Sequence, residues 1–100
     1  MEIVFVEYKV FPEKRGAYLD WVRGISASHP ELEHYEGTDQ PNLFVELWHG
    51  FGQRQYLDFK RNRTELPVDP WSGLADFVPG GLAKVHIWHF RRTMPVSKPT

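Results

Sequence analysis

The chain has 100 residues, no cysteine and a formal net charge of −1. This length fits one small domain, and the absence of cysteine excludes disulfides, thiol nucleophiles and thiolate metal ligands. The near-neutral charge lacks the basic field that attracts a phosphate backbone, so no nucleic-acid partner is expected. No apolar run reaches the roughly 20 residues that cross a bilayer, so no membrane partner is expected.

The N-terminal segment lacks the pattern of a secretory signal peptide, which is a basic stretch followed by a long apolar one. The sequence therefore predicts a soluble, cytoplasmic protein. Aromatic residues make up 15% of the chain, which is more rings than a small core needs. Some of these rings are expected to line a pocket or a subunit interface.

Residues 2–10 predict a strand, because they are rich in β-branched and aromatic side chains and end at Phe11-Pro12. Pro12 cannot donate a hydrogen bond to a sheet and suits the first turn of a helix. A helix is therefore predicted from Pro12 to about Ala27, with acidic Glu13 near its start. Apolar residues recur at the spacing of one buried helical face, at Tyr18, Trp21, Val22 and Ile25.

The rest of the chain is predicted as shorter elements bounded by Gly, Pro and Asn. They are, in chain order, a weak edge strand over 31–37, a turn over 38–42, a clear strand over 43–49, a helix from about 53 to 63, a short helical turn over 71–77 and a last strand over 82–90. The order predicts an α+β fold of the ferredoxin-like βαββαβ type with a four-stranded antiparallel sheet. We expect one domain over residues 1–92 and a flexible C-terminal tail over 93–100.

Alternation along the strands divides their side chains between two sheet faces. One predicted face is mainly aliphatic and carries Val4, Val6, Tyr8, Leu43, Val45, Leu47, Val85 and Ile87. The other is predicted to carry Phe5, Glu7, Phe44, Glu46, Trp48, His86, Trp88 and Phe90. Large rings do not suit solvent, and the helices of such a fold cover one face only. The sequence therefore predicts a homodimer in which a second subunit covers the remaining face.

Three titratable residues fall among the predicted rings, and we interpret Glu46, His86 and Glu7 as candidate catalytic residues. In a pocket, such groups polarise a bound molecule and move protons. The candidate ligand-binding residues are aromatic, namely Phe44, Trp48, Trp88 and Tyr56. The alternative interpretation is a dimer seam in which the carboxylates and the histidine hydrogen-bond each other.

No metal or cofactor site is predicted. His86 and His89 point to opposite sides of one strand and cannot share a metal ion, and no histidine spacing matches a zinc site. Gly80-Gly81 is predicted as a turn, since it lacks the spacing of a phosphate-binding loop. The remaining basic spots are interpreted as solvated surface, at Arg61, Arg63, Arg91 and Arg92.

Residues 43–59, LFVELWHGFGQRQYLDF, form a strand ending in Glu46-x-Trp48, then a turn, then a helix containing Tyr56. This pattern resembles the dimeric α+β barrel superfamily, most clearly its antibiotic biosynthesis monooxygenase-like branch, and the element order extends the likeness over residues 2–90. The resemblance implies a homodimer whose sheets pair into a barrel, with a cavity in each subunit lined by a tryptophan such as Trp48. It does not extend to haem degradation, because the first strand has Glu7 and no Asn, and the second helix has Tyr56 and Asp58 where a His is expected.

Two functions remain open from the sequence. The first is a small-molecule enzyme without a cofactor, monooxygenase-like or isomerase-like, acting on an aromatic or planar substrate. In that case the rings stack on the substrate and a carboxylate or imidazole removes an acidic proton. The second is a non-enzymatic dimeric module that binds a ligand or a protein, with its carboxylates satisfied by neighbouring side chains.

Overall fold

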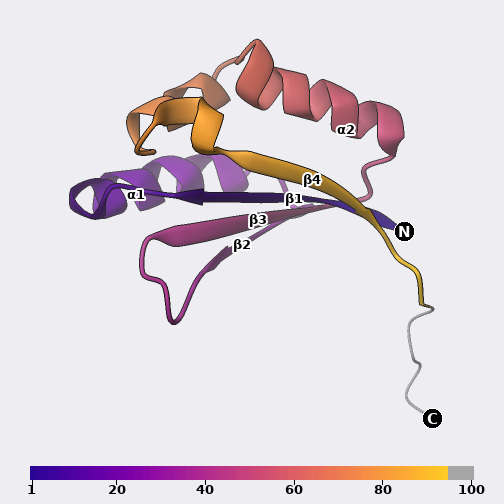
Figure 1. The fold of residues 1–100 in the computed structure, drawn as a ribbon, viewed down its shortest axis with the longest axis horizontal. Coiled ribbons are helices and arrows are strands. Elements are labelled where there is room, and N and C mark those ends of the chain that lie inside the picture. The colour runs from indigo at the N-terminus through magenta and orange to yellow at the C-terminus, as the bar shows by residue number, and fades with distance from the viewer. Residues whose placement is uncertain (95–100) are drawn as a thin grey trace.

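In the computed structural model, which describes residues 1–94, the strands form one sheet, and α2 and the turns after it lie above that sheet (Figure 1). The strands and α-helices are β1 (Glu2–Lys9), α1 (Arg15–Ser26), β2 (Leu32–Glu36), β3 (Leu43–His49), α2 (Gln53–Lys60) and β4 (His86–Arg91). Short helical turns cover Pro12–Lys14, Arg61–Glu65, Trp71–Asp76 and Gly81–Lys84. None of the helices in residues 1–94 has the length and apolar character needed to cross a membrane.

The sheet has the strand order β2-β3-β1-β4, with every neighbouring pair antiparallel. The predicted α+β fold, with its βαββαβ order and four-stranded antiparallel sheet, is confirmed. Two pairings position the site: Val6 of β1 lies opposite Glu46 of β3, and Glu7 of β1 lies opposite His86 of β4. Because directly opposed residues project to the same face, these two pairings assign Glu46 and His86 to opposite sides of the sheet.

The core lies between the sheet and the helices, where Val4, Val6 and Tyr8 of β1 point inward and are almost inaccessible to solvent. Helix α1 contributes Tyr18 and Val22, so the predicted apolar face of this helix does pack into the core. Its Trp21 is partly buried against the same cluster. The periodicity of the helix and the alternation of β1 therefore meet in one interior.

The predicted division of side chains between the two faces is wrong for β3. Phe44, Glu46 and Trp48 were expected beside Phe5 and Glu7, but they share the helix-covered face with the inward residues of β1. The register decides this, because each of the three lies opposite an inward residue of β1 and the aliphatic side of β3 turns outward. The buried face of β3 is thus its aromatic and acidic one.

Two element boundaries also differ from the prediction. The last strand begins at His86 and not at residue 82, because Gly80 and Gly81 have φ of 84° and 71° and start a 3₁₀ turn over Gly81–Lys84. The α-helical part of the second helix ends at Lys60, earlier than the predicted residue 63, and a π-helical turn over Arg61–Glu65 follows it. Residues 95–100 of the predicted tail lie outside the described part of the chain.

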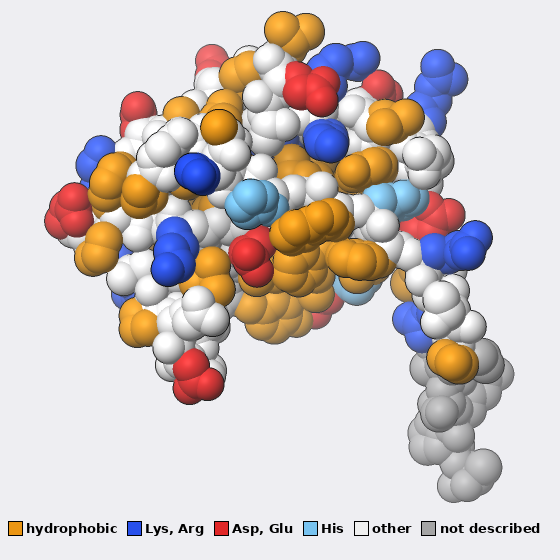
Figure 2. Space-filling model, viewed as in Figure 1, with side chains coloured by type: hydrophobic (Ala, Val, Ile, Leu, Met, Phe, Trp, Pro, Cys, Tyr) orange, Lys and Arg blue, Asp and Glu red, His pale blue; other side chains and the backbone are white. Residues whose placement is uncertain are grey.

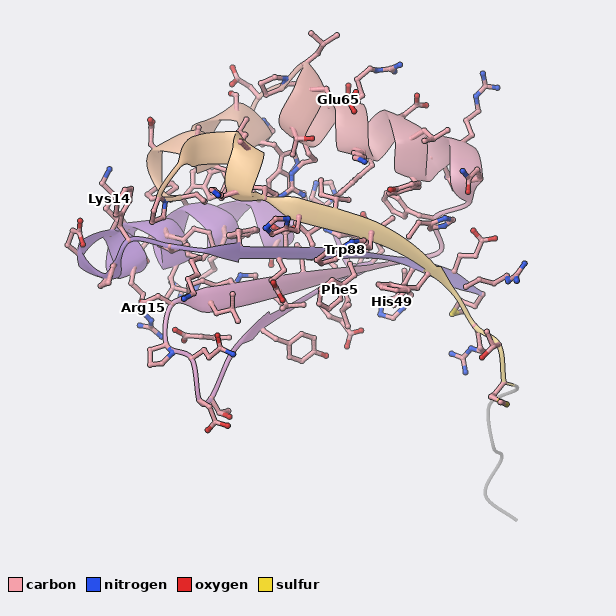
Figure 3. All side chains as sticks on the ribbon, in the orientation of Figure 1. Phe5, Lys14, Arg15, His49, Glu65 and Trp88 are labelled. Atoms are coloured by element: carbon pink, nitrogen blue, oxygen red, sulfur yellow. The ribbon has the colours of Figure 1, made fainter. Side chains whose placement is uncertain are left out.

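Within the part of the chain that the structure describes, no helix or turn covers the outer face of the sheet. Its rings are strongly exposed: Trp88 at 43%, Phe90 at 50% and Tyr35 at 49%. Phe5 and Trp88 lie side by side away from α2, with ring centroids 5.6 Å apart (Figure 3). Hydrophobic side chains gather below the level of β4 beside histidine and acidic groups (Figure 2). This outer face, as predicted, is too apolar for a surface that stays in water.

Candidate functional site

Glu46 and Arg63 form an ion pair that is sealed from solvent, with side-chain exposures of 0% and 1%. The two terminal nitrogens of Arg63 donate to the two carboxylate oxygens, each at 2.9 Å. Trp48 Nε1 donates to Oε1 at 2.8 Å, and the Tyr8 hydroxyl donates to Oε2 at 2.5 Å. Each carboxylate oxygen therefore accepts two hydrogen bonds, which is its full capacity.

Arg63 reaches this position from the π-helical turn that follows α2. Its guanidinium carbon lies 3.7 Å from the ring centre of Trp71 and 5.0 Å from that of Phe59. Stacking on the two rings stabilises the cation and fixes the plane of its fork. Its Nε has no acceptor among residues 1–94, so the pairing with Glu46 uses only the two ends of the fork. A single π turn inside a helix is rare and often marks a specialised position.

The carboxyl group of Glu46 stays ionised in this interior. Burial by itself would raise its pKa, but the charge of Arg63 and the hydrogen bonds from Arg63, Tyr8 and Trp48 outweigh burial and hold the pKa below its usual 4.5. Glu46 is therefore a fixed negative charge in the core, and its neighbours must orient their protons toward it.

A chain of hydroxyl groups extends from this charge to the surface. The Tyr8 hydroxyl lies 2.6 Å from that of Tyr18, and the Tyr18 hydroxyl lies 2.8 Å from His34 Nε2. Because ionised Glu46 has no proton to give, Tyr8 must donate to it and accept from Tyr18. The Tyr18 hydroxyl has one proton and donates it to Tyr8, so it must accept a hydrogen bond from His34. Nε2 of His34 therefore carries the ring proton. Burial raises the pKa of both tyrosines, which keeps these donors protonated.

His34 ends this chain in a shallow hollow of about 200 Å³ that it shares with Leu19, Val22, Arg23 and Ser26. Partial burial lowers the pKa of His34, although the charges of Glu46 and Glu36 act in the opposite direction. With Nε2 committed to Tyr18, Nδ1 is the atom at which the ring gains a second proton.

A second candidate site is a pocket of about 400 Å³ at the end of the sheet where β4 begins. Glu7 and His86, directly opposite each other on β1 and β4, both line it. His86 stacks on Trp88 with ring centroids 5.7 Å apart and an interplanar angle of 16°. The other lining residues are mostly apolar or basic, with Gln40 as a neutral polar group: Tyr8, Leu43, Val78, Pro79, Lys9, Lys84 and Gln40. The pocket thus combines an acid, a base and cations above an apolar floor.

The structure separates the residues that the sequence grouped as one site. Glu7, His86 and Trp88 come together on the outer face, whereas Glu46 lies in the core between Phe44 and Trp48. Neither Glu46 nor Trp48 lines any of the four principal pockets found in residues 1–94. Tyr56 stacks on His89, at a centroid distance of 4.9 Å. Glu7 and His86 are therefore the predicted catalytic residues that can reach a ligand.

The prediction of Arg63 as solvated surface is wrong. The sequence also gives no direct sign that Tyr8 bonds Glu46, or that Tyr18 and His34 extend that hydrogen-bonded chain. Arg63 lies in the polar segment RNRTE. This segment has no hydrophobic periodicity from which a buried side chain could be predicted. One indirect signal does predict a buried cation. A glutamate on the buried face of a strand needs an oppositely charged partner, because an unpaired buried charge is strongly destabilising. That signal depends on knowing which face of β3 is buried.

Comparison with solved structures gives a match over the whole chain. The crystal structure of a "putative antibiotic biosynthesis monooxygenase" from Deinococcus radiodurans matches with a TM-score of 0.65 and 11% sequence identity, covering 100% of both chains. The chain therefore shares the fold of that protein. No protein-family model matches the sequence, and no curated protein matches it either. The likeness is one of fold, and the chemistry must be argued from the side chains.

Replacing Arg63 by Met should lower the free energy of unfolding by about 3–5 kcal/mol, because it leaves the Glu46 charge buried without a cation. Urea denaturation followed by tryptophan fluorescence measures the loss. The matched control is Arg61→Met, which removes an exposed pair with Asp58 and should change stability by less than about 0.5 kcal/mol. Equal losses in the two variants would contradict the assignment.

The same ion pair gives the protein an acid dependence. Since folding lowers the pKa of Glu46, its stabilising contribution is complete above the unfolded pKa near 4.5 and is lost as pH falls through the lower folded value. The stability difference between the wild type and Glu46→Gln should therefore be largest near neutral pH and shrink in acid. A difference that does not change between neutral pH and strong acid would count against an ionised Glu46.

Neutral His34 should be observed by ¹⁵N NMR as the Nε2–H tautomer, because Tyr18 requires a donor there. Tyr18→Phe removes this acceptor and should give a mixture of the two tautomers. His29, which contacts Glu31 through Nδ1 at 3.0 Å, is an internal control and should not respond. Detection of the Nδ1–H form of His34 in the wild type would show that the hydroxyl chain runs the other way.

Proposed function

We propose that this protein is a small-molecule-binding homodimer in which Glu7 and His86 carry out acid–base chemistry on a planar ligand. The observation that carries the proposal is the pocket of about 400 Å³ that these two opposed side chains line. Its volume lies in the range of roughly 300–1,000 Å³ that is usual for small-molecule sites.

The availability of the two side chains supports this assignment. Among residues 1–94, no side-chain hydrogen bond or ion pair engages either Glu7 or His86. By contrast, Glu33, Glu36 and Glu46 on the neighbouring strands each have partners. A carboxylate and an imidazole left without structural partners in a pocket are suited to exchange protons with a ligand.

The chemistry begins with transfer of an acidic proton from the ligand to Glu7 or His86. The resulting anion is planar and delocalised and stacks beside the His86–Trp88 pair. Return of the proton at another position of the ligand is an isomerisation. Capture of the same anion by dioxygen as a co-substrate is the monooxygenase-like alternative. Both reactions share the first proton transfer, which is the step that these residues can perform.

The outer face of the sheet supports a homodimer. A contiguous apolar face rimmed by polar groups is the usual sign of an interaction surface, and the Glu46-x-Trp48 pattern resembles a superfamily named for its dimers. We propose that two copies pair through this face, which buries Phe5, Trp88 and Phe90. The pocket lies at the end of the same face, so the partner also closes its open side.

Phe5→Glu should convert the dimer to a monomer, because the carboxylate would be buried in an apolar interface. Sedimentation velocity over a concentration series measures the change. Leu57→Glu is the matched control, since Leu57 is 54% exposed on α2, away from the outer face, and should leave the dimer intact. A wild-type protein that is monomeric at all concentrations would refute the dimer.

The pocket itself is tested with naphthamide, a neutral planar probe, in an NMR titration. Shifts should concentrate at residues lining the pocket, and His86→Ala should weaken binding several-fold by removing a stacking surface worth about 1 kcal/mol. His49→Ala is the control, because His49 is paired with Glu33 on the same face but lies outside the pocket. Binding that is unaffected by His86→Ala would rule out this site.

Proton transfer is read by incubating 1,3-dihydroxynaphthalene, whose ring C–H bonds exchange through a delocalised anion, with the protein in D₂O. Glu7→Gln and His86→Ala should slow deuterium incorporation, while Glu33→Gln should not. A bound probe that exchanges no faster than in buffer would favour the non-enzymatic dimeric module. That alternative has one observation on its side: the interior around Glu46 and Trp48 is packed and satisfied.

A further inference from the structure

Lys84 stands beside the Glu7–His86 pocket in a position that the backbone of Gly80 prepares. Gly80 has φ of 84°, and a Cβ built on it would lie 2.7 Å from Lys84 Cγ, 3.4 Å from Cε and 3.7 Å from Cδ. The aliphatic stem of Lys84 therefore occupies the space where any other residue at position 80 would carry a side chain. Glycine at this position has two roles: it permits the left-handed turn and it makes room for the lysine stem.

The cations at this pocket have no ion-pair partner within the described residues, 1–94. No ion pair in residues 1–94 includes Lys9 or Lys84, although acidic Glu7 lines the same pocket. The pocket is thus lined by two lysines and one glutamate together with apolar residues and Gln40. Lys9, Lys84 and Glu7 together give the lining a positive charge balance, even though the whole chain carries a net charge of −1.

We infer that this pocket selects planar anions, with Lys84, positioned by Gly80, holding the anionic group of the ligand while its ring lies on the apolar floor. The inference rests on the proposed function and adds the substrate class: an aromatic or otherwise planar carboxylate or comparable acid. An ammonium and an anion at a partly exposed site attract each other, and the attraction weakens with salt. Lys9 supplies a second cation at the same pocket.

The arrangement also divides the work within the pocket. Lys84 and Lys9 hold the anionic group, which leaves Glu7 and His86 to exchange a proton elsewhere on the ligand. A cation near the ligand also favours the extra negative charge that forms when the ligand loses a proton. Lys84 is in this scheme a specificity-determining residue for the proposed chemistry.

The test compares naphthoate with naphthamide, two probes of nearly equal shape that differ in charge, by NMR titration of the wild-type protein and its variants. Wild type should bind naphthoate more tightly than naphthamide by up to about fivefold, the upper end of what one partly exposed ion pair contributes. The preference should shrink in about 1 M salt, where the Debye length is about 3 Å. Lys84→Met keeps an apolar stem but removes the charge, and should lower the preference without weakening naphthamide.

A pair of glycine variants separates the positioning of Lys84 from backbone strain. Gly80→Ala forces the Lys84 stem aside and should lower the naphthoate preference, as Lys84→Met does. Gly81→Ala imposes similar strain, because Gly81 has φ of 71°, but nothing lies within 4 Å of its added Cβ, so the preference should persist. Amide NMR spectra show whether the two glycine variants are folded. If they are not, the comparison of wild type with Lys84→Met alone tests the inference.

Each outcome decides between the two proposals. Equal binding of the two probes by wild type, or an unchanged preference in Lys84→Met, would overturn the inference while leaving a pocket for neutral planar ligands. Binding of neither probe would remove the pocket and this inference with it. A naphthoate preference that is lost in Lys84→Met and Gly80→Ala but kept in Gly81→Ala would establish the pocket and the positioning of Lys84 by Gly80.

Discussion

The buried ion pair between Glu46 and Arg63 is the constraint on which the rest of the interior depends. A carboxylate this far from water is tolerated only with a cation and a complete set of hydrogen-bond donors, and the chain provides both. Meeting that need brings the turn after α2 down onto the sheet and stacks Arg63 on Trp71. The rings around the pair then fill the space between sheet and helices, and Trp48, which the sequence resemblance predicts in a cavity, packs among them.

Because the interior around Glu46 is packed, the candidate ligand pocket lies on the outer face of the sheet and at its end. The two sides of the sheet differ in kind: the helix-covered side has its charges paired and its rings packed, whereas the outer side exposes both rings and unpaired titratable groups. A ligand that binds there meets side chains that have no structural duty in the single chain. Under the proposed function, substitutions that change ligand preference fall on this face and leave the core intact, which separates stability from specificity.

Much of the fold was predictable because local signals agreed with it. The alternation of residues 2–10, the helical spacing of Tyr18 and Val22, and the strand over 43–49 each specify an element without tertiary information. The β4 boundary was missed because residues 82–85 are as apolar as a strand, and only the positive φ of Gly80 and Gly81 turns them into a 3₁₀ helix. The faces of β3 were assigned wrongly because both of its sides carry large apolar side chains. Its register against β1, a long-range property, decides which one is buried.

The hydrogen-bonded chain that begins at Arg63 passes through five segments of the fold in turn. It connects the turn after α2 to β3, then β1, α1 and β2, ending at His34. No segment in this series can detach alone without leaving a charge or a hydroxyl group unsatisfied inside the protein. Local unfolding of any one of these segments therefore costs free energy. We expect the five segments to unfold together as one cooperative unit.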